Sequence, residues 1–198
     1  MPSRTPAENA AVSYEEAFRL LKPTLECTVT EKIPYLGKVE LPDDPHDPLP
    51  PEMVSAMRDF VWMNAATLDL LHEGAGASEC YFTVEWCGPG TILSHLSKAR
   101  NAARLLAIKI VLDAEHENPS GAIESIRDGL ALHAALGREP TLISGLVSCA
   151  VGHITVDAAT RFMAQAGNLT NDELSVLQQA FSSSAESLSL RTGYIGEV

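Results

Sequence analysis

The chain is poor in basic residues, and this shortage limits its partners. Of its 198 residues, 14 are Lys or Arg against 26 Asp or Glu, which gives a formal net charge of −12. Nucleic-acid affinity comes mainly from Lys and Arg side chains that displace counterions, so we expect no nucleic-acid partner. An anionic membrane surface is disfavoured for the same reason.

The chain also lacks the sequence motifs of enzymes and metal sites. Its four cysteines form no Cys-x-x-Cys pair, and there is no Gly-x-Ser-x-Gly, His-Glu-x-x-His, phosphate loop or dinucleotide glycine pattern. We therefore expect no cofactor and no metal. The sequence does not reveal whether Cys27, Cys80 and Cys87 are bridged, because that depends on the compartment.

No uninterrupted apolar run reaches the ~18 residues that a membrane span needs. The nearest is 140–156, which is uncharged but interrupted by His153. We therefore predict a soluble chain without a membrane span, in an undetermined compartment. The apolar residues of 140–166 surround most of a helix, which predicts a helix enclosed by its neighbours in the centre of a bundle.

Six segments have apolar residues at helical spacing and are bounded by capping or turn residues. The expected helices are 5–22, 51–72, 92–117, 121–136, 140–166 and 170–188. The last four are joined by short connections, which predict antiparallel neighbours. The expected fold is all-α, a stack of antiparallel helical hairpins or an irregular bundle.

We predict a single helical domain over 1–198, with a peripheral helix and a proline-rich segment in 1–52 and the main core in 53–190. The tail 191–198 carries no helix-stop signal, which leaves open that the chain is a fragment of a longer protein. The proline-rich segment is a long irregular connection, and such connections are usually functional or wrapped on the surface.

Segment 78–90 alternates apolar and polar residues as an extended strand does. It could pair with 28–41 in a small two-stranded element. Its aromatic residues, Trp86 among them, predict either a lid over the core or an exposed strip that recognises a partner.

Charge is unevenly distributed along the chain. Residues 40–90 carry ten acids and one base, whereas 91–112 carry four bases and no acid. Arg100 and Arg104 lie one helical turn apart and could hold a partner's carboxylate. The alternatives are that the acidic segment lies against this basic helix, or that both are solvated faces.

Residues 117–132 resemble part of a tetratricopeptide repeat. Ala122 and Gly129 stand where the repeat has small residues and Ile126 where it has a bulky one, after a short turn at 117–120. The resemblance covers half of one repeat, with no second copy at a 34-residue period. It implies paired antiparallel helices that bind proteins. The whole chain also resembles uncharacterised bacterial helical proteins, which implies a fold and no chemistry.

Three residues could instead form a ligand site. His153 and Asp157 are spaced to share a helix face, and His133 could approach them from the preceding helix. The leading prediction is nevertheless a non-catalytic scaffold that binds a protein or peptide. The alternatives are a small-molecule or metal-dependent enzyme at these three residues and a homo-oligomeric structural module.

Overall fold

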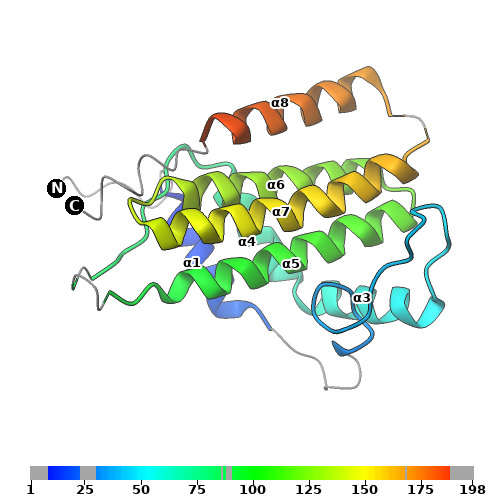
Figure 1. Ribbon diagram of the computed structural model, residues 1–198, viewed down its shortest axis with the longest axis horizontal. Helices are drawn as coiled ribbons and strands as arrows, with labels where there is room; N and C mark the ends of the chain where they lie inside the picture. Colours follow the sequence, from blue (N-terminus) through cyan, green and yellow to red (C-terminus); the bar gives the residue numbers. More distant parts are fainter. Residues whose placement is uncertain (1–8, 23–29, 86, 88–90, 168, 188–198) are drawn as a thin grey trace.

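The computed structural model describes residues 9–22, 30–85, 87, 91–167 and 169–187. These residues form seven α-helices and no strand, which confirms the all-α prediction (Figure 1). The helices are α1 (Ala10–Leu20), α3 (Pro51–Met63), α4 (Ala65–Ala75), α5 (Ser94–Glu115), α6 (Pro119–Gly137), α7 (Leu142–Gln165) and α8 (Asn171–Ser187).

Helix α5 is the centre of the bundle. It packs against α6 and α7 along its length and also contacts α1 and α3. Its first half joins a cluster with α1 and α4 that includes Tyr14 and Leu71, and its second half joins a cluster with α3, α6 and α7 that includes Phe60. The predicted inner face of 92–117 is buried as expected, in Leu96, Ala99, Ala103, Leu106 and Ile110.

Helices α1, α6, α7 and α8 begin at side chains that accept from free backbone amides. Thr170 and Glu173 form the predicted reciprocal capping box of α8, with Thr170 N donating to Glu173 Oε2 at 2.8 Å. Thr141 caps α7 by accepting from Ser144 N. Asn118 caps α6 by accepting from Gly121 N, and Pro119 occupies the first helical position.

The predicted helix 51–72 is wrong as a single element, because the chain breaks at Asn64 into α3 and α4. The buried Asn64 side chain accepts from Lys22 N at 2.8 Å and donates to Phe60 O at 3.0 Å. An asparagine that bonds the backbone in this way competes with continued helix. Its amide also fastens α1 to the α3–α4 junction.

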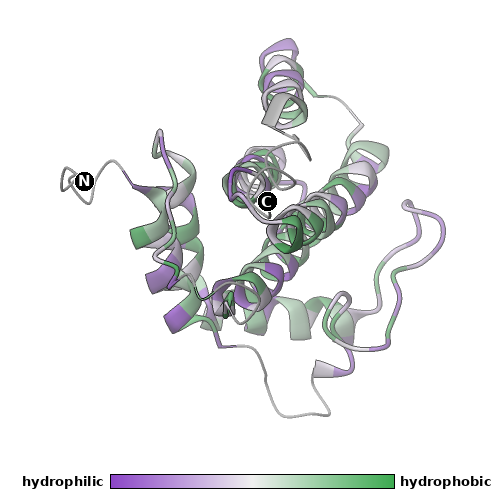
Figure 2. Cartoon of the chain, turned by 60° about the vertical axis from the view of Figure 1, so that its left-hand side comes forward, coloured by the Kyte–Doolittle hydropathy of each residue, from purple (hydrophilic) through white to green (hydrophobic). Residues whose placement is uncertain are grey.

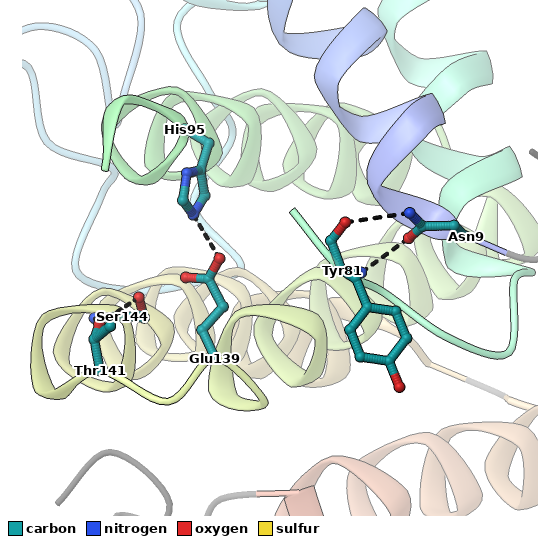
Figure 3. A network of polar contacts seen from close by, with 6 residues as sticks. All are labelled: Asn9, Tyr81, His95, Glu139, Thr141 and Ser144. Atoms are coloured by element: carbon teal, nitrogen blue, oxygen red, sulfur yellow. Dashed lines mark hydrogen bonds and ion pairs between the residues drawn. The ribbon is translucent and has the colours of Figure 1, made fainter. Parts of the chain in front are cut away.

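Segment 78–90 is not a strand where the structure describes it: its one ladder contact is an isolated bridge between Glu79 and Asn9. The Asn9 side chain also exchanges two hydrogen bonds with the Tyr81 backbone (Figure 3). Trp86 lies outside the described residues, as does the predicted start of the first helix at Thr5.

Residues 30–50 wrap over the second half of α7. Arg161 Nη1 donates to Pro42 O at 2.8 Å, Gln165 Nε2 to Pro45 O at 2.6 Å, and Tyr35 Oη to Asp157 at 2.8 Å. The described part of the proline-rich segment is therefore held on the surface by contacts about 120 residues apart in sequence.

The prediction that 140–166 is enclosed on all sides is wrong. Helix α7 buries one face on α5 and α6 and leaves the other open. Its exposed large apolar residues are Leu142, Ile143, Leu146, Val156 and Met163. By length and composition α7 is the one helix in the described residues that could cross a membrane, a test that core helices of soluble proteins also pass.

Candidate functional site

The exposed face of α7 forms a regular seam. Its members are separated by alternate steps of four and three residues and are all exposed: Leu142, Leu146, Cys149, His153, Val156, Thr160 and Met163. This is the heptad spacing by which one helix packs along another. We call these seven residues the α7 seam.

The inner face of α7 consists mostly of small and polar side chains, whereas the exposed face carries its leucines. Ser144, Ser148 and Thr155 are buried there, together with Gly152. A Cβ on Gly129 of α6 would lie 2.6 Å from Thr155 Oγ1, so the two helices pack too closely for larger residues. The two leucines of α7, Leu142 and Leu146, face outward, while Val151 and Phe162 are the large apolar side chains that it buries.

Helix α8 does not cover the seam. Among the described residues its main contact is with α6, through a face that includes the buried Leu177. In both overall views α8 lies at the top, on one side of the bundle (Figures 1 and 2). It carries exposed apolar residues of its own, Leu174 and Val176.

The three residues of the predicted ligand site are not brought together. His133 is buried, with Nδ1 2.7 Å from Ser148 O and 2.9 Å from Ser148 Oγ. His153 is exposed in the seam, not a core histidine, and Asp157 accepts from the Tyr35 hydroxyl. Burial and the negative Asp157 raise the pKa of Tyr35 well above its usual range.

The predicted partner-binding arginines lie on α5. Arg100 is exposed, and Arg104 is half-buried with Nη1 donating to Asn101 at 3.2 Å. Within the described residues neither forms an ion pair with the acidic segment 40–90, so the expected docking of that segment on them is not observed.

Sequence reasoning missed a cleft of about 490 Å³ between α3–α4 and α5–α6. Trp62 is 81% exposed at the rim of this cleft. His72 Nδ1 lies 3.2 Å from the buried Asp128, and its Nε2 lies 3.5 Å from Glu124. Burial is the largest effect on Asp128 and raises its pKa to about 6, against the opposing effect of His72.

A second polar cluster lies at the end of the bundle near the α6–α7 turn. His95 Nε2 is 2.8 Å from Glu139 Oε1 (Figure 3). The ring of Phe82 stacks on the His95 imidazole, with the ring centroids 4.5 Å apart. Burial, with Glu139 as the second cause, raises the pKa of the Cys80 thiol to about 12. A thiol with so high a pKa stays protonated, so Cys80 is not an activated nucleophile.

Nothing in the described residues forms a group of three or more His, Cys, Asp or Glu side chains that could hold a metal ion. The residues around His72 are not such a group, because Asp128 approaches its Nδ1 and Glu124 approaches its Nε2, on different sides of the imidazole. The sequence carried no signal for this arrangement, since His72 and Asp128 are 56 residues apart. The spacing of the α7 seam, by contrast, is readable in the sequence.

The chain has no match among known protein families, curated proteins or solved structures. In the part of the chain that the structure describes, the fold is a helical bundle in which α7 has a long exposed apolar face.

Proposed function

We propose that this chain is a non-catalytic interaction module whose docking surface is the α7 seam and whose ligand is an amphipathic helix of a protein. The observation that carries the proposal is the exposure of apolar residues at heptad spacing along the seam. Leu146 is 59% exposed and Val156 42%. Large apolar patches are rare on monomers and mark interaction surfaces.

The chemistry of the seam favours a protein helix over a lipid surface. Helices that lie on membranes carry Lys and Arg along their polar face. The one basic residue of α7, Arg161, is buried and bonded to Pro42. A heptad seam also has the regular hollows that the side chains of another helix fill.

Arg100 and Arg104 supply a second contact in this proposal. Both arginines are available because no ion pair holds them within the described residues. A partner with a carboxylate near its docking helix would gain charge-assisted hydrogen bonds there. The resemblance of 117–132 to a protein-binding repeat adds to the same reading.

A photo-crosslinking amino acid at position 146 tests the proposal in the native host. We expect a discrete protein adduct, identified by mass spectrometry, and direct binding of that purified protein. Binding should be lost in Leu146→Glu and kept in Val12→Glu, a control on α1 with a similarly exposed apolar side chain. Absence of adducts, or Leu146-dependent binding to neutral phosphatidylcholine vesicles, would contradict it.

The rival proposal is an enzyme centred on His133, His153 and Asp157. It has less support, because His133 is buried against Ser148 while the other two lie on the exposed side of α7. Elemental analysis of the purified chain discriminates between the classes, since stoichiometric metal would favour the enzyme.

A further inference from the structure

We infer that the helix that occupies the α7 seam is α7 of a second copy of this chain, packed in parallel so that like residues face one another. This inference rests on the proposed function and names its partner. It is carried by three features of the seam: the distribution of its polar residues, its lack of charge and its length.

The seam has the residue pattern of a parallel helix pair. In heptad notation, its d positions are all apolar or thiol-bearing, namely Leu142, Cys149, Val156 and Met163, and its a positions are Leu146, His153 and Thr160. A polar residue at an a position fixes register and favours a defined number of strands in parallel coiled coils. His153 and Thr160 would serve in this way.

Parallel alignment also matches the uneven distribution of apolar residues along α7. Leu142, Ile143 and Leu146 are exposed within its first turn and a half, whereas further along the exposed Val156 and Met163 alternate with His153 and Thr160. In an antiparallel pair the apolar start of one copy would lie against the mixed end of the other. In a parallel pair Leu142 and Leu146 pack on their own equivalents, and His153 and Thr160 face polar side chains instead of apolar ones.

The low charge of the α7 seam allows a second copy of this chain to be the partner. Two copies with a net charge of −12 repel each other, so a contact between them needs a surface with little charge. Along α7 the charged residues are Asp157 and Arg161, and Arg161 is buried. Asp157 lies beside the seam and already accepts from Tyr35.

The size of the seam sets the expected strength of the dimer. A helix rises 1.5 Å per residue, so the seam is about 32 Å long, and a strip about 12 Å wide on each copy gives roughly 800 Å² in total. Such an area belongs to weak, reversible interfaces. We therefore expect a dissociation constant of roughly 10–100 µM.

Sedimentation of the purified full chain over about 1–500 µM tests for this dimer. We expect a reversible monomer–dimer equilibrium, lost in Leu146→Glu and in Val156→Glu and kept in Val12→Glu. Circular dichroism checks that each variant is folded. A chain that stays monomeric throughout overturns the inference, and the proposed function then still stands if position 146 crosslinks to a different protein. Dimers that survive both seam variants also overturn it.

The native Cys149 can test whether the two α7 helices are parallel, so no cysteine has to be introduced. In the parallel pair the two Cys149 thiols face each other at a d position, and diamide would oxidise them to one disulfide while accepting their two electrons and two protons. In a Cys27→Ser, Cys80→Ser, Cys87→Ser background we expect a covalent dimer that Cys149→Ser abolishes. A seam-dependent dimer that does not crosslink there overturns the parallel arrangement.

Discussion

Helices α5 and α7 have similar lengths, but the less charged of the two is the more exposed. Helix α5 has 22 residues of which six are charged, and it lies at the centre of the bundle. Helix α7 has 24 residues of which two are charged, yet one whole face of it is open. The number of apolar residues in a helix therefore does not decide how deeply it is buried.

The difference arises from where each helix places its leucines. Helix α5 turns large side chains such as Leu105 and Ile108 inward, and its exposed basic residues Lys98 and Arg100 reach water. Helix α7 turns Ser144, Ser148 and Thr155 inward, which permits a close approach to α6 but leaves its leucines outside. A large apolar face that is left outside in this way is available to bind another molecule.

The largest expected effect comes from matched truncations on the two helices. Leu105→Ala on α5 should cost about 2–5 kcal/mol of unfolding free energy, because Leu105 is fully buried. Leu146→Ala on α7 should cost less than about 0.5 kcal/mol in the monomer. Urea denaturation at low protein concentration measures both, and equal losses would show that α7 is as enclosed as α5.

A somewhat smaller effect concerns the one carboxylate with a strongly raised pKa in the described core. The folded-state pKa of Asp128 is about 6 and its ordinary value is 3.8. The native state therefore holds this proton more tightly than the unfolded chain, and the contribution of Asp128 to stability rises as the pH falls from about 7 towards 4. The shift of roughly two units corresponds to at most about 3 kcal/mol.

Asp128→Asn tests this expectation because it removes the charge and keeps the shape. We expect the variant to be more stable than the wild type at pH 8 and to lose the gain in stability between pH 7 and 4. Denaturation curves at several pH values measure the difference. Glu124→Gln is the control, since Glu124 is exposed beside the same His72. A variant that is less stable at pH 8 would show that the His72 contact outweighs the cost of burial.

The inner face of α7 should give the next effect. Ser148 Oγ donates to His133 O at 2.8 Å in a buried setting. Ser148→Ala leaves that carbonyl and the imidazole with fewer partners and should cost about 1–2 kcal/mol. Thr160→Ala, which removes an exposed hydroxyl from the same helix, should cost less than about 0.5 kcal/mol. Comparable losses in the two variants would contradict the two-faced description of α7.

The sequence was sufficient to predict the helices apart from the break at Asn64, but not the direction in which α7 faces. Helix existence and several ends follow from local signals such as the Thr170–Glu173 box, and these predictions hold. The direction in which a helix faces is set by contacts between residues distant in sequence, for example Gly129 against Thr155. A count of apolar residues in 140–166 carries no such direction, and we therefore expected enclosure.

The candidate sites differ in the same respect: some features can be read in the sequence, and others arise only from tertiary packing. The heptad spacing of the α7 seam can be read in the sequence, but its exposure cannot, because exposure depends on which face packs on α5 and α6. The pairing of His72 with Asp128 cannot be read there either, since packing of α4 on α6 brings them together. The site at His133, His153 and Asp157 stays a prediction: His133 is buried on α6, whereas His153 and Asp157 are exposed on α7, and helical spacing alone does not reveal this difference.

The smallest expected effect on stability separates the arginines of α5 from the seam of α7. Replacing Arg100 and Arg104 together with alanine should lower the unfolding free energy by less than about 1 kcal/mol. Both side chains are exposed or half-exposed, and among the described residues Arg104 bonds to Asn101.

The dissociation constant of the dimer should stay within about twofold of the wild-type value in this double variant, because the seam contact involves no arginine. Binding of a partner crosslinked at position 146 that carries a carboxylate should weaken, and isothermal titration calorimetry at low and high salt measures this change. A large loss of stability would show instead that the two arginines support the bundle, and an unchanged affinity would confine docking to α7.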